Sequence, residues 1–374
     1  MSSAASGWAR TASYLGYLSQ PEEKGGQGIP CENVKTLAWF AVPGFLDGYL
    51  QFMKNRAGGI LTGATHEFLA LIKWLTQPKL GYLYQQPDFQ RTLPVDFQNR
   101  AWQEMCAQQY EQAGKLQRVY KSEIAVGRDP FGPISHLIES AQPMEYMADM
   151  IERMRRDRPV GGGAFKEAVW SRNIFIIKLL LSNPLRLRNV ACLKWFGPGR
   201  GPGEEETLYQ RDDGSWWIYV PKRFLKNRSS GSEIRDYHAP VHASVWPDLE
   251  RYLFKHRAVL MRCPTDYVIL TSSLGPRSAT NAEQLIEHRP YYDVSRLVSD
   301  LTARYLWKTG GVGAHAFRHI VATSILKAPG GDIKTAALVL NDKETTVEKH
   351  YSGLRSADGN NRMAELLEKS FSRM

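Results

Sequence analysis

The sequence predicts a mainly α-helical protein with a small antiparallel β-sheet, divided into two domains. Three observations favour this fold class. Apolar residues recur at helical spacing along most of the chain, strand-like segments gather between residues 207 and 241, and a proline with three glycines interrupts the pattern at 158–163. With 374 residues, the chain is long enough to bury two separate cores.

The first half of the chain is expected to be helical after a loose leader. Residues 1–34 are polar and glycine-rich, which predicts little packed structure. Apolar residues at helical spacing then predict several helices, the last of them at 144–156. Because Pro159 and the glycines after it cannot continue a helix, we expect a first domain at 35–160 and a second at 161–374.

The second half is expected to combine helices with three strands. It opens with a strongly apolar helix at 165–182. Alternating apolar residues predict strands at 207–210, 215–220 and 234–241, the last two joined by a polar turn at 227–232. Further helices are expected at 246–261, 292–307, 317–327, 333–340 and 345–350, followed by a helical stripe of Met363, Leu366, Leu367 and Phe371.

Lysines and arginines outnumber acidic residues, which gives a net charge of +10 and a pI near 9.3. A surplus of this size suits a polyanion such as nucleic acid, because each phosphate neutralised by Lys or Arg releases counterions and adds affinity. Charge alone leaves a basic enzyme that binds no nucleic acid equally open.

The cysteines and the apolar segments narrow the class of protein. The four cysteines are far apart and form no Cys-x-x-Cys pair; they are Cys31, Cys106, Cys192 and Cys263. This spacing argues against a zinc site and a disulfide framework, and it suits a reducing compartment. No apolar run is long enough to span a membrane, and the N-terminus lacks the pattern of a secretory signal. We therefore expect a cytoplasmic protein.

A basic cluster near the C-terminus carries the strongest chemical signal. His315 and Arg318 lie one helical turn apart, so a helix that begins near Ala316 brings both side chains to one point at its N-terminus. Free N–H groups there favour phosphate, and an arginine can donate two parallel hydrogen bonds to it. Alone, His-x-x-Arg is a weak motif, and a simple surface position explains it as well.

An arginine-rich turn follows the apolar helix at 165–182. The chain there reads Asn-Pro-Leu-Arg-Leu-Arg-Asn-Val-Ala-Cys-Leu-Lys-Trp, from Asn183 to Trp195. This stretch resembles the box of tyrosine recombinases (phage integrases) in which a turn ending Gly-Leu-Arg leads into a helix that finishes Leu-x-Trp. On that resemblance, Arg186 is the first catalytic arginine.

Two further motifs extend the resemblance. The segment His315-x-x-Arg318-His319 resembles the second box of tyrosine recombinases. Tyr351 falls at about the interval that the family places between its second arginine and its nucleophile. The three motifs stand in the right order within residues 165–374, and together they are far more specific than any one of them.

The resemblance implies a catalytic set of five residues, which are Tyr351, Arg186, Arg318, His315 and Lys226. Family members carry a catalytic lysine in the turn between two strands, and Lys226 fits that location. Lys222 is its competitor, closer to the end of the preceding strand. A surface lysine is the default interpretation for either residue.

The sequence departs from the family pattern at one position. Where tyrosine recombinases usually have Gly followed by His or Trp, shortly before the tyrosine, this chain has Asn341 and Asp342. A carboxylate beside a phosphate is unfavourable unless it is protonated, turned away or bound to Arg186 or Arg318. Asp342 therefore puts the role of a third site histidine in doubt.

Several nearby residues have simpler explanations than catalysis. His319 matches the family's second box and could line the site, but a buried structural role is favoured. His350 is expected to be a bystander, because helix neighbours point about 100° apart. Three other tyrosines of this half follow no His-x-x-Arg box and are expected to be core or surface residues; they are Tyr291, Tyr292 and Tyr305.

With these residues, the resemblance implies a DNA-breaking and -rejoining reaction. The Tyr351 hydroxyl would attack a phosphodiester and leave a 3′-phosphotyrosyl link and a free 5′-hydroxyl. Arg186 and Arg318 would neutralise charge on the non-bridging oxygens, and Lys226 would protonate the departing oxygen. His315 would assist proton transfer at the tyrosine or hold the phosphate. The reaction implies no cofactor and no metal.

The resemblance also implies partners. The first domain would be a helical core-binding domain that completes a two-domain clamp around double-stranded DNA. The stripe from Met363 to Phe371 resembles the tail helix that family members dock into a neighbouring subunit, which implies a homotetramer on two DNA sites. Packing on its own subunit is the equal alternative. Accessory DNA-bending proteins would complete the set, and the bound enzyme would associate with a bacterial nucleoid.

Three functions remain open at this level. The first is a site-specific recombinase or integrase. The second is a type IB topoisomerase, which shares the tyrosine, arginine and lysine chemistry but relaxes DNA without exchanging partners. The third is a DNA-binding relative with reduced activity, which Asp342 favours and the five retained site residues oppose.

Overall fold

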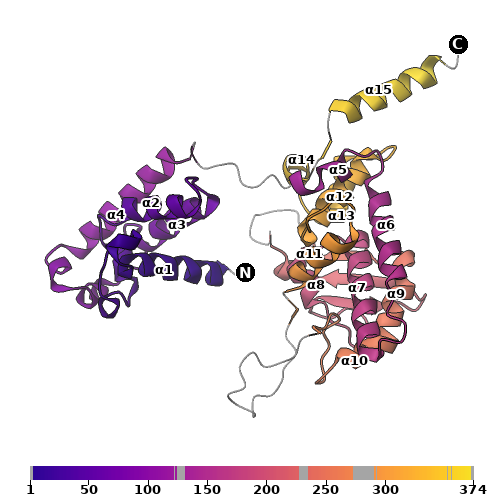
Figure 1. Ribbon diagram of the computed structural model, residues 1–374, viewed down its shortest axis with the longest axis horizontal. Helices are drawn as coiled ribbons and strands as arrows, with labels where there is room; N and C mark the ends of the chain where they lie inside the picture. The colour runs from indigo at the N-terminus through magenta and orange to yellow at the C-terminus, as the bar shows by residue number, and fades with distance from the viewer. Residues whose placement is uncertain are drawn as a thin grey trace. The chain divides into compact units, whose positions relative to one another are not determined.

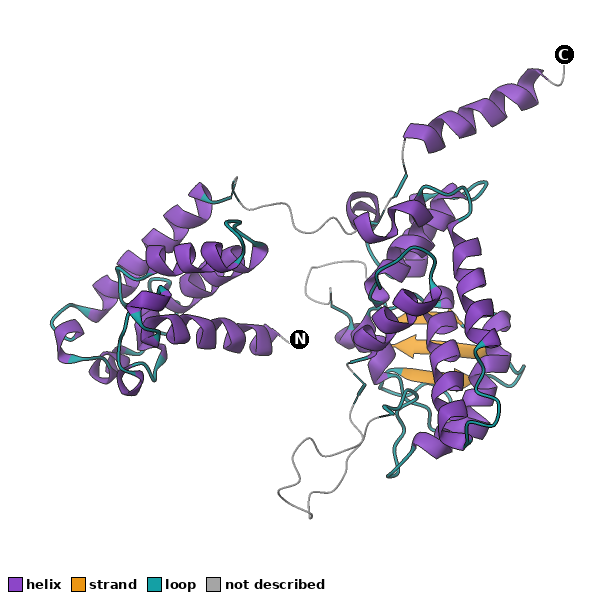
Figure 2. Ribbon diagram, viewed as in Figure 1, coloured by secondary structure: helices purple, strands orange, loops and turns teal. Residues whose placement is uncertain are grey.

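The structure of the protein is a computed structural model, and it describes residues 3–121, 123, 131–226, 235–272, 290–291, 293–351, 353–354 and 356–371. This part of the chain is mainly helical and holds one three-stranded antiparallel sheet (Figure 1, Figure 2). The predicted fold class is therefore confirmed. The chain divides into two compact units, Met1–Asp129 and Pro130–Met374.

The first unit packs its helices around an aromatic core. Its described α-helices are α1 (Ser3–Ser19), α2 (Leu46–Arg56), α3 (Gly63–Thr76) and α4 (Trp102–Val119). Short 3₁₀ helices lie between them at Glu22–Lys24, Cys31–Asn33, Leu37–Ala41, Pro87–Thr92 and Val95–Phe97. The ring centroids of Tyr49 and Phe68 lie 4.6 Å apart in that core, within the range of favourable aromatic contacts.

The predicted loose leader at residues 1–34 is wrong. Most of helix α1 is ordered against the first unit's core, with Tyr14, Tyr17 and Leu18 almost fully buried. The ring of Tyr14 packs edge-on against that of Phe40, with centroids 4.9 Å apart. Burial of these large side chains offsets the conformational entropy that ordering the segment costs.

The second unit surrounds its sheet with helices. Before the sheet lie the 3₁₀ helix Gly132–Ile134 and helices α5 (Ser135–Ile138), α6 (Pro143–Arg156), α7 (Ala164–Ser182) and α8 (Leu187–Cys192). After it come α9 (Trp246–Glu250), a π-helical segment at Arg251–His256, α10 (Arg257–Leu260), α11 (Val294–Tyr305), α12 (Ala314–Lys327), α13 (Ile333–Leu340), α14 (Glu344–His350) and α15 (Ser356–Phe371). From Ile174 to Leu180, helix α7 is buried on all sides and lies in the core, as its apolar sequence predicts.

The two units divide between Asp129 and Pro130, ahead of the boundary predicted at 160–161. Helix α6 belongs to the second unit, because Met147 and Met154 are buried in the same apolar core as α7. The proline and glycines before α7 therefore form a connection between two helices of one core. They end a helix, as expected, but they do not separate two domains.

The sheet is close to its prediction. Strands β1 (Thr207–Gln210), β2 (Trp216–Val220) and β3 (Tyr237–Pro240) pair antiparallel in that order. Ile218 pairs with Leu208 on one side and with Ala239 on the other, and it faces the core. The predicted turn at 227–232 lies outside the described residues, and so does Tyr292, the predicted first residue of α11.

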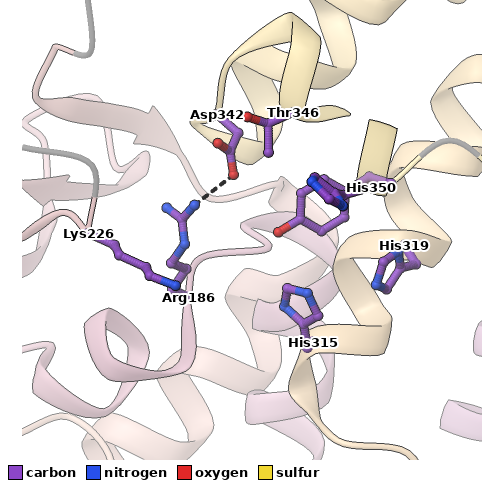
Figure 3. A pocket seen from close by; sticks show the side chains of 8 residues that line it. Arg186, Lys226, His315, His319, Asp342, Thr346 and His350 are labelled. Carbon is purple, nitrogen blue, oxygen red and sulfur yellow. Dashed lines mark hydrogen bonds and ion pairs between the residues drawn. The ribbon is translucent and has the colours of Figure 1, made fainter. Parts of the chain in front are cut away.

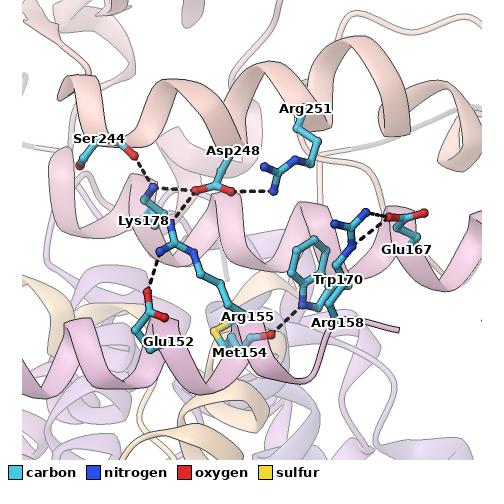
Figure 4. A network of polar contacts seen from close by, with 10 residues as sticks. All are labelled: Glu152, Met154, Arg155, Arg158, Glu167, Trp170, Lys178, Ser244, Asp248 and Arg251. Carbon is cyan, nitrogen blue, oxygen red and sulfur yellow. Dashed lines mark hydrogen bonds and ion pairs between the residues drawn. The ribbon is translucent and has the colours of Figure 1, made fainter. Parts of the chain in front are cut away.

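A buried charge network joins helices α6, α7 and α9 (Figure 4). Lys178 of α7 donates to the Asp248 carboxylate at 2.6 Å and to the Ser244 carbonyl. Arg251 and Arg155 lie 3.1 and 3.6 Å from the same carboxylate. This network accounts for Lys178, the buried lysine of α7, because a buried ammonium must be paired.

The last helices form a small apolar cluster of their own. Side chains of α12, α13 and α14 pack around Val347 and Leu340, both buried. On α15, three residues of the predicted stripe are exposed, namely Met363, Leu367 and Phe371, while the side chain of Leu366 lies outside those described. Among the described residues, no helix has both the length and the apolar content needed to cross a membrane.

Candidate active site

Arg186 lies in the turn between α7 and α8. It has an extended backbone and occupies the position just before α8, where its carbonyl accepts the first helical hydrogen bonds from Asn189 and Val190. Its side chain is 22% exposed, and it donates from Nη2 to the Asp342 carboxylate at 2.7 Å. A guanidinium in this position can therefore meet an anion that approaches from solvent.

Arg318 is held almost completely out of solvent, at 1% exposure, in the first half of α12. Its guanidinium donates to the carbonyl oxygens of Pro184 and Leu340, the second at 2.9 Å. It also donates from Nη2 to the Asp342 carboxylate at 3.0 Å and from Nε to the Tyr351 hydroxyl at 3.3 Å. One side chain thus joins three segments that are distant in sequence.

The two histidines of the His-x-x-Arg-His segment lie one turn apart on α12. Helix α12 begins at Ala314, two residues before the expected start, so both rings lie in its first two turns. The ring centroids of His315 and His319 are 5.0 Å apart, and those rings lie 5.4 and 4.9 Å from the ring of Tyr351. The second box therefore contacts the tyrosine through both histidines.

The environment of His315 favours its neutral form. Burial lowers the pKa of this imidazole from its ordinary value of 6.5, and the positive charges of Arg318, Arg186 and Lys226 lower it further. The Asp342 carboxylate acts in the opposite direction and is the weakest of these influences. A neutral imidazole at physiological pH can accept a proton, which is what a general base beside a phenol must do.

Tyr351 follows directly after α14 and is only 4% exposed. Its backbone N–H donates to the Val347 carbonyl at 2.9 Å, and the small cluster of α12, α13 and α14 packs against its ring. The guanidinium carbon of Arg318 lies 5.1 Å from the centroid of that ring. The phenol thus reaches the arginine within its own chain.

These side chains surround a cavity of about 370 Å³ (Figure 3). Its described lining consists of Arg186, Lys226, His315, His319, Asp342, Thr346, His350 and Tyr351. Lys226 reaches it from the segment after β2, while its competitor Lys222 is not among the described lining residues. The five predicted catalytic residues therefore lie close together. Four of them line the cavity, and the fifth, Arg318, donates a hydrogen bond to the Tyr351 hydroxyl.

Asp342 bridges the two arginines. A single oxygen, Oδ2, accepts from both Arg186 and Arg318, and the carboxylate itself is fully buried. Of the three arrangements that the sequence left open for this residue, the structure has it bound, and bound to both arginines. The preceding Asn341 ends α13 with a left-handed backbone, φ 47°, which turns the chain towards the site.

Two lining residues were missed by sequence reasoning. Thr346 was not considered, and His350 was expected to be a bystander, yet both line the cavity. They are four residues apart on α14 and so share a helix face. This i, i+4 spacing is the sequence feature that could have placed both residues on the face of α14 that lines the cavity. The reasoning that set His350 apart assumed a continuous helix through Tyr351, whereas α14 ends at His350.

Tyr291 and Tyr305, the other described tyrosines considered as possible nucleophiles, make contacts away from the cavity. The Tyr305 hydroxyl donates to Asp157 at 2.9 Å, and the Tyr291 ring lies 5.5 Å from the guanidinium carbon of Arg172. Both pack against the main core of the second unit, which agrees with the structural role expected for them. Tyr292 lies outside the described residues.

Taken together, the site joins an acceptor for a phenolic proton, two guanidinium groups and an exposed lysine around one hydroxyl. Guanidinium groups stabilise negative charge that builds on phosphate oxygens. The arrangement suits nucleophilic attack on a phosphoryl centre, with Tyr351 as the attacking group.

Comparison with known proteins gives matches in structure. The chain matches two tyrosine recombinases over most of its length. One match is a crystal structure of XerA recombinase, whose sequence is 15% identical to this one. The matched region covers 86% of this chain and 97% of XerA, with a TM-score of 0.37. The other is the XerH site-specific recombinase, bound to its difH substrate in a pre-cleavage complex, whose sequence is 12% identical to this one. The matched region covers 96% of this chain and 94% of XerH, with a TM-score of 0.44.

These matches concern the fold, and at such identities and TM-scores they carry no argument about chemistry. No protein-family model matches the chain, and no curated protein sequence is similar to it. What the protein does must therefore be argued from the geometry of its own site.

Proposed function

We propose that this protein is a site-specific DNA recombinase or integrase that cleaves and rejoins strands through Tyr351. The observation that carries the proposal is the 3.3 Å hydrogen bond from Arg318 to the Tyr351 hydroxyl, in a cavity also lined by Arg186, Lys226 and His315. The net charge of +10 supports a DNA partner, because DNA binding depends on neutralising phosphates.

In the proposed reaction, the phenol oxygen of Tyr351 bonds to phosphorus as the bond to the 5′ oxygen breaks. His315 takes the phenolic proton, which its lowered pKa allows because the imidazole is neutral. Arg186 and Arg318 stabilise the charge on the non-bridging oxygens. Lys226, exposed at the cavity, gives a proton to the departing 5′ oxygen. Reversal of these steps by another strand's 5′-hydroxyl would complete an exchange.

The wider assembly is part of the same proposal. The first unit would serve as the core-binding domain on double-stranded DNA. The exposed apolar residues of α15, Met363, Leu367 and Phe371, would dock on a neighbouring subunit in a homotetramer. Their exposure favours docking over packing of this stripe on its own subunit, to which α15 is joined at its start by the Asp358–Lys327 ion pair.

A DNA-binding relative with reduced activity is the second candidate. The observation that favours it is the contact of the Asp342 carboxylate with both arginines that the reaction needs. A type IB topoisomerase is a third, and strand exchange between two duplexes distinguishes it from a recombinase, since a topoisomerase reseals the strand that it cut.

A suicide substrate tests the covalent step. Duplexes that bind the purified full-length protein would be selected from random sequences and nicked beside the cleaved phosphate, so that the short 5′-hydroxyl product diffuses away. We expect a protein–DNA adduct that survives denaturation with the wild type and none with Tyr351→Phe, because the phenol oxygen is the atom that forms the bond.

Tyr305→Phe is the matched control, since it removes a tyrosine hydroxyl from the same unit away from the cavity. It should trap as much adduct as the wild type. If the wild type binds the selected duplexes tightly but traps nothing, the protein is a DNA-binding relative and the enzyme proposal fails.

A further inference from the structure

The region around Asp342 suggests a property that neither the fold nor the motifs imply. We propose that the Asp342 carboxylate is a built-in stand-in for the substrate phosphate, which holds Arg186 and Arg318 until a DNA backbone displaces it. This inference rests on the proposed function for the identity of the displacing group, but the anion site itself can be tested without any cleavage.

The Asp342 carboxylate occupies the place between the two arginines that a bound phosphate would take. Oδ2 lies 2.7 Å from Nη2 of Arg186 and 3.0 Å from Nη2 of Arg318, which are distances of charge-assisted hydrogen bonds. A non-bridging phosphate oxygen that engages both guanidinium groups must approach the same two nitrogens. Carboxylate and phosphate oxygens therefore compete for one anion-binding position between the two arginines.

Arg318 has almost no hydrogen-bonding capacity left for a phosphate. It donates four hydrogen bonds, to the Pro184 and Leu340 carbonyls, to Asp342 and to the Tyr351 hydroxyl. A guanidinium carries five N–H groups, so a phosphate cannot form the usual pair of parallel bonds without replacing an existing partner. The two carbonyls belong to the fold, so Asp342 and Tyr351 are the partners that can leave.

The negative charge of Asp342 opposes the binding of phosphate beside it. The Asp342 carboxylate is fully buried, and burial of an anion is favourable only when cations pair with it. A phosphate entering the cavity would place a second anion beside it, and like charges at close range in a buried site repel. The carboxylate must therefore move away from the two arginines when phosphate binds between them.

The chain around Asp342 allows such a movement. The residue lies in the three-residue connection between α13, which ends at Leu340, and α14, which begins at Glu344. This connection starts with the left-handed Asn341 and leads into the short helix that precedes Tyr351. Withdrawal of the carboxylate and freeing of the phenol from Arg318 are thus coupled through a single short segment.

The test uses inorganic phosphate as the probe and the full-length protein. Melting temperature would be measured in sodium phosphate and in sodium chloride of equal ionic strength, and phosphate affinity by calorimetric titration. Asp342→Asn keeps the shape but removes the charge, so it leaves two arginines without their anion. We expect this variant to melt lower in chloride, to recover in phosphate, and to bind phosphate about tenfold more tightly than the wild type.

Two variants serve as controls. Glu344→Gln removes one negative charge from the exposed start of α14 and should behave as the wild type in both salts. Asp342→Glu keeps a carboxylate near the arginines and should remain nearly insensitive to phosphate. Phosphate stabilisation of Asp342→Glu equal to that of Asp342→Asn would overturn the proposal, because charge would then not be the cause.

The proposal also fails if Asp342→Asn binds phosphate no better than the wild type, which would make Asp342 a support for the arginines. Should that variant not fold in chloride, refolding in phosphate replaces the melting experiment. Recovery of folded protein in phosphate supports the proposal, and failure to refold in phosphate as well as in chloride rejects it. Since no covalent step is measured, this result is independent of the suicide-substrate assay.

Discussion

Two buried carboxylates in the second unit have similar partners but opposite surroundings. Asp248 accepts from Lys178 at 2.6 Å and lies near Arg251 and Arg155 (Figure 4). Asp342 accepts from Arg186 and Arg318 (Figure 3). The first lies between packed helices, whereas the second lines a cavity beside a phenol.

The comparison teaches that a cluster of buried charges is not by itself a site. Around Asp248 the cations are paired within the fold, and the network joins α6, α7 and α9. Around Asp342 the same kind of pairing opens onto a space that a phosphate can enter. We therefore expect substitutions in the first cluster to change stability and substitutions in the second to change chemistry.

The largest stability effect is expected from Asp248→Ala. It leaves the ammonium of Lys178 buried without its carboxylate, and removal of one partner of a buried ion pair costs about 3–5 kcal/mol. Urea unfolding would measure the loss. Adduct formation per folded molecule should stay at the wild-type level, and a parallel loss of adduct would show that the two clusters are coupled.

The largest effect on chemistry after loss of the nucleophile is expected from Arg186→Lys. The positive charge remains, but lysine lacks the planar fork that holds a phosphate, so the rate of adduct formation should fall about 100-fold. The free energy of unfolding should change much less than the rate, since lysine keeps a positive charge beside the buried Asp342 carboxylate.

Arg188→Lys is the matched control for that variant. Arg188 lies two residues further along and donates to the Phe224 carbonyl at 3.0 Å. Its replacement should leave the adduct rate within about twofold of the wild type, because it makes no contact with Tyr351 or Asp342 in the described structure. A loss as large as that of Arg186→Lys would mean that the first arginine has been misassigned.

The smallest effect is expected from the pH dependence that His315 contributes. Because the folded pKa of His315 is below its ordinary value, the unfolded chain takes up a proton that the folded protein resists. Its contribution to stability is present above about pH 6.5 and is lost as pH falls towards the lowered pKa. His315→Gln should flatten the dependence of the unfolding free energy on pH in that window.

His66→Gln, which replaces an exposed histidine of the first unit, should keep the wild-type slope. An unchanged slope in His315→Gln would show that the imidazole is not held neutral by its surroundings. The proposed transfer of the phenolic proton to His315 would then need another acceptor.

Much of the fold could be predicted because local patterns decide it. The apolar helix α7, strand β1 and helix α13 follow from periodicity. Helix α1 was missed because the polar, glycine-rich segment that follows it set the prediction for the whole of residues 1–34, although Tyr14, Tyr17 and Leu18 lie at helical spacing and become buried. The domain boundary was misplaced because glycine and proline report where a helix ends and not which core it joins.

The candidate site divides in the same way. The positions of Arg186, Arg318, His315 and Tyr351 followed from short motifs in order. The contact of Asp342 with both arginines could not be predicted, because it depends on how α8, α12 and α13 pack. The carbonyls of Pro184 and Leu340 that hold Arg318 have no sequence signal at all, since every residue carries a carbonyl.

Those two carbonyls have a consequence for how the protein matures. Arg318 reaches the turn before α8, the end of α13 and the phenol only after all three segments have docked. A nascent or partly folded polypeptide therefore lacks the contact between Arg318 and the Tyr351 hydroxyl. Under the proposed chemistry, docking of these segments is a precondition for cleavage, so an incompletely folded copy cannot break a DNA strand.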